Sequence, residues 1–403
     1  MKLVKILGTP DSALSYMERL VNDGSPSKFS FKNIVSKETC PLYTEQFNIC
    51  ALVDSKSSFL SFGEIPTFEY IYDTIQDDYI FVHPDWTKHT TPYKIMQTDI
   101  PVFPTSSSRT VKVNGCDYYI KMFYPGILGR ITRELRVEHI NSSIEITKIL
   151  SNLLKSPDAP STFSFFPEKG GKLYKHPDGD IGYVIRDSIP KGKNTKGIHA
   201  IVPAFSLFSS DQQNNDIPII IQILNQKKSV KSFILEQLFF PIIDCYFFCI
   251  IKGGIHPEMH SQNFLIGFDS NFDILSIILR DLESFDKDLS ICMNLGLSTS
   301  FQSYPFKCID ETQYNYKIKH SFMFDHKLGE YFFDQIIESL VQYRFFEKGQ
   351  LEYEIKNYVN KKYGEYLTNF FPDNGMWYKF ENVLIDRTNI ERPYIEIKNP
   401  KYR

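Results

Sequence analysis

The sequence predicts an α+β protein in which a mixed N-terminal region and an antiparallel β-sheet precede a mainly helical region. The sheet is indicated by apolar residues that alternate with polar ones on either side of an Asn114-Gly115 turn, a strong local signal for a hairpin. The helical part is indicated by the apolar period of residues 322–346. We expect this helical region to wrap around a polar motif at residues 253–285.

Other segments have clear local patterns. Residues 11–24 carry apolar side chains on one stripe, which predicts an amphipathic helix. Residues 79–82 form a short apolar run typical of a strand, and residues 131–154 have a helical period. The polar segment 209–216 predicts a surface loop and marks a candidate domain seam.

Composition argues against several kinds of partner. The 403 residues carry a net charge of −3 and the pI is about 6.3, so nothing indicates nucleic acid or a membrane surface. The 34 Phe and 24 Tyr favour well-packed interiors. The seven cysteines form no Cys-x-x-Cys pair, and the first residues lack an export signal. We therefore expect buried thiols in a reducing cytoplasm.

The most apolar stretch of the chain is residues 233–251. It contains Glu236, Asp244 and Pro241, which a bilayer-spanning helix would tolerate poorly. We predict a buried helix that is kinked near Pro241.

A polar loop stands between apolar elements at residues 253–263. It opens with two glycines and is followed at once by a short strand at residues 264–267. Its polar side chains are His256, Glu258, His260, Gln262 and Asn263. A second strand, residues 274–279, ends at Arg280 and Asp281. Buried polar groups are costly unless they hold something, so we place the active site here.

Oxygen ligands in this motif suit a metal ion. The loop supplies Glu258 and Asn263, and the strand end supplies Asp281. Such a set of oxygens is what a magnesium ion carrying phosphates prefers. For His256 we favour a structural role, orienting the loop through a hydrogen bond, over a position facing the ligand.

Basic residues are regularly spaced upstream of the loop. Arg109 stands beside Ser107 at the entry to the hairpin, and Lys121 follows twelve positions later at the end of the second strand. Arg133 follows another twelve positions later, where we expect a helix to start. Singly, these are most simply solvated surface charges. Together with the carboxylates and amides of residues 258–281, they indicate a site for an anion with several phosphate oxygens.

In this order the motifs resemble those of one enzyme family, the NRPS-independent siderophore synthetases of the aerobactin (IucA/IucC) type. The resemblance rests on the run 104–111, on Lys121 and Arg133, on Glu258-x-His260-x-Gln262-Asn263, and on Arg280-Asp281. His83-Pro84 resembles the start of the family's His-Pro-Trp-Gln motif, and Asn399-Pro400 its closing Asn-Pro. Several motifs in order, with matching spacing over residues 80–400, make the resemblance specific.

The resemblance implies a ligase that depends on ATP and Mg²⁺. In that family a carboxylic acid, commonly citrate or a derivative, is adenylated with release of pyrophosphate. An amine or hydroxyl then attacks the acyl-adenylate to give an amide or ester. The implied partners are the small-molecule acid and a polyamine- or hydroxamate-type nucleophile, with a homodimer as an option. The implied fold is a cupped hand, with a thumb-like region at 1–100, a fingers-like nucleotide-binding region at 101–225 and a palm-like helical region at 226–403.

The resemblance also implies roles for single residues. The ATP phosphates would be held by Ser107, Arg109, Lys121 and Arg133. Magnesium would be held by Glu258, Asn263 and Asp281. His260 and Gln262 would contact the nucleotide phosphate or the acyl group, and His83 would line the same pocket. The substrate candidates are Arg133, His260 and Lys379, and the catalytic candidates are His260, Arg133 and Lys121.

The chain also departs from the family pattern. Asp85-Trp86 follows His83-Pro84, and Gly129 stands where the family usually has a threonine associated with substrate contact. The chain is shorter than typical members, mainly ahead of His83. Nucleotide chemistry is therefore expected to be retained, while the acid substrate stays open.

Two alternatives remain at the level of sequence. The spacing of His256, Glu258, Asn263 and Asp281, with Lys121 as a strand lysine, also parallels a protein-kinase catalytic loop. No glycine-rich loop precedes Lys121, however, and a glutamate stands where a kinase has its catalytic aspartate. The other alternative is a degenerate homologue that binds a ligand without catalysis. A kinase would release ADP, whereas a synthetase would release AMP and pyrophosphate.

Overall fold

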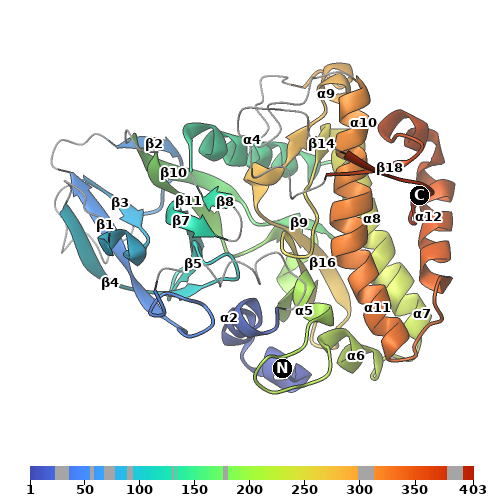
Figure 1. Cartoon of the computed structure of the whole chain (residues 1–403), viewed down its shortest axis with the longest axis horizontal. Coiled ribbons are helices and arrows are strands. Elements are labelled where there is room, and N and C mark those ends of the chain that lie inside the picture. Colours follow the sequence, from blue (N-terminus) through green and yellow to red (C-terminus); the bar gives the residue numbers. More distant parts are fainter. Residues whose placement is uncertain are drawn as a thin grey trace.

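The computed structural model describes residues 1–22, 36–54, 59–67, 78–88, 94–128, 131–133, 135–175, 180–297, 313–378 and 394–403. These residues form a strand-rich half and a helix-rich half, with a smaller second sheet lying between them (Figure 1). The predicted α+β class is confirmed.

The larger sheet has eight strands in the order β2-β10-β11-β6-β5-β4-β1-β3, and the paired neighbours are antiparallel. Its strands are β1 (Phe47–Asp54), β2 (Leu60–Gly63), β3 (Asp78–Val82), β4 (Lys94–Pro104), β5 (Thr110–Val113), β6 (Tyr118–Met122), β10 (Glu168–Tyr174) and β11 (Ile181–Asp187). The ring centroids of Phe81 on β3 and Tyr183 on β11 lie 5.2 Å apart, so the sheet curls toward closure around its apolar core.

The predicted hairpin is confirmed as β5 and β6. Thr110 lies opposite Lys121 in its register, and Gly115 in the turn has a left-handed φ of 71°. The short strand expected at residues 79–82 is the core of β3. Lys121 therefore lies near the end of a central strand, with its side chain buried.

The smaller sheet has five strands in the order β12-β9-β16-β15-β13, and β16 and β9 are parallel. The strands are β9 (Phe163–Phe165), β12 (Lys191–Gly192), β13 (Ala200–Pro203), β15 (Phe264–Phe268) and β16 (Ile274–Leu279). Three two-stranded pairs are β7 (Tyr124–Leu128) with β8 (Ile131–Arg133), β14 (Ile255–His256) with β17 (Asp286–Lys287), and β18 (Gly375–Tyr378) with β19 (Tyr394–Ile397). The strands predicted at residues 264–267 and 274–279 are confirmed as β15 and β16.

Most helices lie in the helix-rich half, and α2 and α4 flank the sheets (Figure 1). Near the N-terminus are α1 (Leu3–Gly8) and α2 (Pro10–Leu20), and α4 (Val137–Leu153) packs on β10 and α8. The others are α5 (Ala204–Phe208), α6 (Ile219–Leu224), α7 (Val230–Ser232), α8 (Phe240–Gly253), α9 (Leu289–Asn294), α10 (Gln313–Ser321), α11 (Gln335–Gln342) and α12 (Gln350–Phe370). Two segments are π-helical, η4 (Phe233–Phe239) and η6 (Phe322–Asp334), and three are 3₁₀ turns, η2 (Pro84–Lys88), η3 (Thr195–Gly197) and η5 (Leu282–Ser284). The amphipathic helix expected at residues 11–24 is α2, and the loop expected at residues 209–216 joins α5 to α6.

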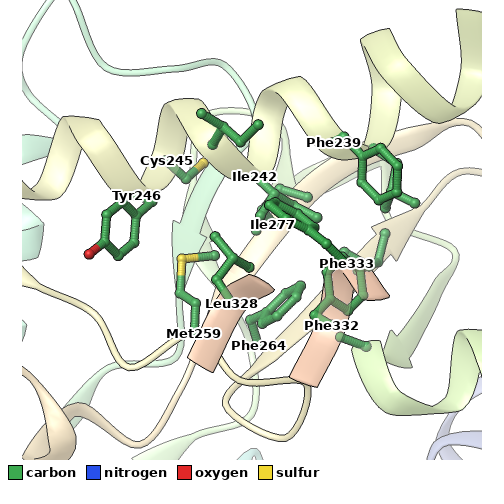
Figure 2. Packing of buried hydrophobic residues seen from close by; sticks show 14 of the residues in the cluster. Phe239, Ile242, Cys245, Tyr246, Met259, Phe264, Ile277, Leu328, Phe332 and Phe333 are labelled. Atoms are coloured by element: carbon green, nitrogen blue, oxygen red, sulfur yellow. The ribbon is translucent and has the colours of Figure 1, made fainter. Parts of the chain in front are cut away.

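The main core lies between α8, the smaller sheet and η6. Figure 2 shows Ile242 of α8 with Ile277 of β16 and Leu328 of η6, and all three side chains are fully buried. Burial of each such side chain contributes about 1.5–3 kcal/mol. This core fixes the helices against the strands that carry the polar loop.

A π-helical segment, η4, precedes Pro241 and runs directly into α8, and the kink itself stays a prediction. Proline lacks the N–H that an α-helix needs at this point, so the preceding turn is free to widen. The continuous helix Val230–Gly253 is the only one among the described residues long and apolar enough to cross a membrane. Because 67% of its apolar window is buried inside the fold, it is the core helix that the sequence predicts.

One expectation needs correction. The helix expected over residues 131–154 begins only at Val137, because residues 131–133 pair with β7 as strand β8. Arg133 therefore ends a strand instead of starting a helix. The expected region boundary at residue 100 falls inside β4, so the regions 1–100 and 101–225 share one sheet. The division into three regions stays a prediction.

Candidate active site

Helix α8 ends at a glycine pair that releases the chain into the polar loop. Gly254 has a left-handed φ of 60°, and a Cβ there would lie 2.7 Å from Cys292 Sγ, so only glycine fits. The loop then pairs with β17 through β14, and the Arg280 backbone N–H donates to the Asn263 carbonyl oxygen at 2.9 Å. Both ends of the loop are thereby tied to the strand end that carries Asp281.

Asp281 is held in an unusual backbone conformation directly after β16. Its φ is 66°, in the left-handed region that non-glycine residues adopt where the surroundings over-determine them. Its Oδ1 accepts hydrogen bonds from Lys121 Nζ on β6 and, at 3.2 Å, from an Arg186 amino group on β11. The end of the smaller sheet is therefore joined to two strands of the larger one.

Glu283 extends this contact toward the hairpin entry. Its Oε1 lies 2.8 Å from Lys121 Nζ and 3.1 Å from an Arg109 amino group. We call the five residues Arg109, Lys121, Arg186, Asp281 and Glu283 the charge cluster. The Lys121 and Arg186 side chains are only 3% and 5% exposed, whereas the Asp281 side chain is 30% exposed. A solvent-borne ligand would therefore meet the Asp281 carboxylate before these two cations.

The cations keep both carboxylates of the cluster ionised. Burial raises the pKa of Asp281, but the charges of Lys121 and Arg186 lower it by more than burial raises it. The pKa of Asp281 therefore lies well below its usual range. Burial likewise raises the pKa of Glu283, and Lys121 and Arg109 bring it down to about 2. At neutral pH both groups are therefore anions that a metal ion could use.

Glu258 and Asn263 lie together in the loop, as predicted. Asn263 Nδ2 approaches Glu258 Oε2 at 3.5 Å and Ser284 Oγ at 3.4 Å. Lys327 of η6 pairs with Glu258 Oε1 at 2.7 Å. Burial raises the pKa of Glu258 and the Asp281 charge adds to this, but Lys327 and His260 more than offset both, so the pKa is lowered. Two of the three predicted metal ligands, Glu258 and Asn263, are therefore neighbours in the loop.

His260 is buried within the same loop. Burial lowers its pKa to about 4, so the ring is neutral at pH 7. Its Nδ1 accepts a hydrogen bond from the Gln262 backbone N–H at 3.2 Å, and the Gln262 carbonyl accepts one from Arg280 Nε at 2.7 Å. Backbone and side chains thus fix the ring in place, while the Gln262 side chain is only partly buried.

The hairpin entry is a tight, hydroxyl-rich turn. Ser107 Oγ accepts a hydrogen bond from the Thr110 N–H at 3.1 Å, and Ser108 has a left-handed φ of 64°. The Met122 N–H donates to the Arg109 carbonyl at 2.9 Å. The turn therefore places Arg109 beside Lys121 at one end of the hairpin.

Several residues of the site could not be singled out from the sequence. Glu168 is fully buried and accepts a hydrogen bond from Arg186 Nε at 2.7 Å, and Glu18 of α2 accepts one from the Ser106 N–H at 3.1 Å. Glu18 also pairs with Arg280. Glu283 follows Asp281 closely enough to have been a candidate, but Arg186, Glu168, Glu18 and Lys327 carry no local motif. Only the fold brings them to the site.

Three predicted site residues stand apart from this picture. His83 packs edge-on against Tyr124 and Phe47, with ring centroids 4.9 and 5.6 Å away, and its Nδ1 accepts from the Asp85 N–H. Its place in the ligand pocket stays a prediction. The backbone of Arg133 is described but its side chain is not, and Lys379 lies outside the described residues, as does Gly129.

A second histidine cluster lies behind the loop. His256, His320 and Asp288 are buried, and their ligand atoms lie within 4.8 Å of one another. The imidazole rings of His256 and His320 are stacked at 4.2 Å with 22° between their planes, and His320 Nε2 lies 3.0 Å from Asp288 Oδ2. Because a metal lies in the plane of each ligating ring, one ion could not bond to both rings as they stand. The stacking fits a structural role for His256, but the expected orienting hydrogen bond is wrong, because neither ring nitrogen has a hydrogen-bond partner among the described residues.

Comparisons with known proteins agree on the kind of fold. No family model matches the chain. Over 255 residues, 60% of the chain, it is 22% identical to the L-2,3-diaminopropanoate–citrate ligase of Staphylococcus aureus, and the match spans 41% of that ligase. The petrobactin biosynthesis protein AsbB from Bacillus anthracis matches 89% of the chain and 69% of its own, with a TM-score of 0.67 and 15% identity.

The ATP-bound aerobactin synthetase IucA from Klebsiella pneumoniae matches 97% of the chain and 79% of its own, with a TM-score of 0.68 and 13% identity. The chain has the siderophore-synthetase fold. The resemblance to the aerobactin-type synthetases predicted from the sequence motifs is thereby confirmed. Because these solved structures are less than 25% identical to the chain, their likeness settles the fold, and the activity is argued separately below.

The buried pair beneath the charge cluster gives a stability prediction. Arg186→Met leaves the fully buried Glu168 without this cation, so we expect the free energy of unfolding to fall by about 3–5 kcal/mol. Urea unfolding measures this change, and adding Glu168→Gln should restore part of it. The control is Lys362→Met, whose surface pair with Asp244 should contribute about 1 kcal/mol or less. An Arg186→Met variant as stable as the control would contradict the assignment.

Proposed function

We propose that the protein is an ATP- and Mg²⁺-dependent ligase that adenylates a carboxylic acid and condenses it with an amine or hydroxyl nucleophile, as in siderophore biosynthesis. The charge cluster is the observation that carries this proposal, because it gathers cations for phosphates and carboxylates for a metal at one place. The similarity to a diaminopropanoate–citrate ligase and to an ATP-bound synthetase supports the same activity.

The hairpin would hold the ATP phosphates. Arg109 and Lys121 are now neutralised by Glu283 and Asp281, and phosphate oxygens would take the place of these carboxylates. A guanidinium also offers two parallel donors to a phosphate, which suits Arg109 to this task. Ser107 and Arg133 remain proposed members of the same grip. Concentrated positive charge is needed because a carboxylate attacking the α-phosphate suffers repulsion between two anions.

The loop and the strand end would hold magnesium. Glu258, Asn263 and Asp281 offer oxygen atoms, the donors that Mg²⁺ prefers. The Asp281 charge also raises the pKa of Glu258, a mutual repulsion that a divalent cation would relieve. Asn263 lies 3.5 Å from Glu258, and the hydrogen bond from the Arg280 N–H to the Asn263 carbonyl holds the strand end with Asp281 beside the loop, so these residues would fit the ion. When bound, Mg²⁺ would supply charge neutralisation at the phosphates.

His260 is the proposed positioning or acid–base group for acyl transfer. Its ring is buried, neutral at pH 7 and fixed by the Gln262 backbone, so it can hydrogen-bond a reacting group without carrying charge. Arg133 and Lys379 stay proposed contacts to the acid and the second substrate.

The acid is proposed to be citrate or a related carboxylate, and the nucleophile a polyamine- or hydroxamate-type molecule. The described cysteines are free thiols, which supports a reducing, cytoplasmic setting.

The reaction type can be tested directly. The purified protein is incubated with ATP, Mg²⁺ and citrate, 2-oxoglutarate or succinate, with hydroxylamine to trap an acyl-adenylate. We expect AMP and pyrophosphate in equal amounts, together with the acyl hydroxamate. Stoichiometric ADP would contradict the proposal and favour the kinase-like alternative. Nucleotide binding without turnover on any acid would favour a degenerate binding protein.

The metal assignment gives a separate prediction. Asp281→Asn keeps the size and the tolerance for a left-handed backbone but removes the charge, so it tests the carboxylate alone. We expect the rate of AMP formation to fall about a hundredfold or more, since a metal at a reacting phosphate contributes several kcal/mol. The matched control is Asp273→Asn, at a surface pair with Lys227, which should retain the wild-type rate. Equal rates and equal Mg²⁺ dependence in the two variants would contradict the assignment.

A further inference from the structure

Lys327 enters the site from a different part of the fold than the other cations. It belongs to the π-helical segment η6, whereas Arg109, Lys121 and Arg186 come from the larger sheet. Its Nζ lies 2.7 Å from Glu258 Oε1, and the residue is 7% exposed. π-Helical turns re-aim side chains and are frequent at functional sites. No sequence motif explains why a cation should be placed here.

The ammonium group of Lys327 lies between two aromatic side chains. It lies 5.2 Å from the Phe322 ring centroid and 5.9 Å from that of Tyr331, so two aromatic faces stabilise its charge. Its charge also lowers the pKa of His260, which places it within electrostatic reach of the proposed acyl-transfer group. Lys327 therefore contacts the same loop that carries His260, at a residue two positions before it.

The proposed function gives Glu258 a second partner, and this changes the position of Lys327. A carboxylate bound to a divalent cation has far less negative charge to share with an ammonium group. The Lys327–Glu258 ion pair would then be weaker, and an arriving anion would offset the cost of keeping this cation buried. Arg109 and Lys121 are already matched to phosphates in the same scheme, and Arg186 keeps its pair with Glu168. The remaining anion of the reaction is the acid substrate.

We propose that Lys327 is a positioning residue that pairs with Glu258 while the metal is absent and with a carboxylate of the acid substrate once the metal is bound. This inference rests on the proposed function. In this scheme Lys327 becomes available to the acid only after Glu258 has bound Mg²⁺. It also explains why a polycarboxylate such as citrate suits the site, because one carboxylate can react while another is held by Lys327.

The exchange can be measured without any turnover. Lys327→Met keeps the length and apolar character of the side chain but removes the competing cation. In calorimetric titrations of Mg²⁺ in the presence of a nonhydrolysable ATP analogue, we expect Lys327→Met to bind Mg²⁺ several-fold more tightly than the wild type. Lys327→Arg, which keeps the charge, should bind Mg²⁺ like the wild type. A purely structural ion pair would leave Mg²⁺ binding unchanged or weaker in Lys327→Met, and that result would overturn the proposal.

A second arm tests the acid. In the AMP-release assay, KM for the acid should rise at least about tenfold in Lys327→Met, as expected when one charged hydrogen bond to a ligand is lost, while KM for ATP stays near the wild-type value. Lys362→Met is the surface control and should change neither constant. An unchanged KM for the acid would overturn the proposal that Lys327 pairs with a carboxylate of the acid substrate. If the wild type releases no AMP with any acid, the proposed function fails, and the Mg²⁺ titration still judges the pairing with Glu258.

Discussion

The site depends on charge neutralisation across the junction of two sheets. Arg109, Lys121 and Arg186 project from the larger sheet, and Asp281 and Glu283 follow the last strand of the smaller one. Cations this deeply buried need counter-ions, and the carboxylates of the chain supply them. Asp281 is also suited to a metal, and Arg109 and Lys121 are suited to phosphates. We infer that ATP phosphates replace the carboxylates as partners of Arg109 and Lys121, and that Mg²⁺ replaces Lys121 as the partner of Asp281.

This constraint explains several local features that otherwise look unrelated. The left-handed backbone of Asp281 turns its carboxylate toward the larger sheet, and Gly254 lets the loop leave α8 where Cys292 blocks any larger residue. The π-helical segment η6 brings Lys327 to Glu258 from the opposite side. Each feature is locally unfavourable or uncommon. Each positions a charged side chain of the site, either directly or through the loop that carries Glu258. The packed core around α8 holds these elements in register.

The sequence predicts the parts of the site that lie in continuous motifs. The Asn114-Gly115 turn predicts the hairpin that carries Lys121, and the alternation of apolar strands with a polar loop predicts the region from Glu258 to Asp281. Contacts between distant segments are another matter. Arg186 and Lys327 stand alone in their elements, and only the tertiary structure pairs them with Asp281 and Glu258. The helix expected over residues 131–154 is present as α4, but its expected start at Arg133 is wrong because the tertiary pairing of β8 with β7 overrides the local period.

The most direct test of the exchange is a structure of the protein bound to Mg²⁺ and a nonhydrolysable ATP analogue. The account predicts that Arg109 and Lys121 contact phosphate oxygens and lose their direct contacts with Glu283 and Asp281. The buried pair of Arg186 with Glu168 should remain intact beneath them. A complex in which the phosphates are bound while Arg109 and Lys121 still pair with both carboxylates would contradict the account.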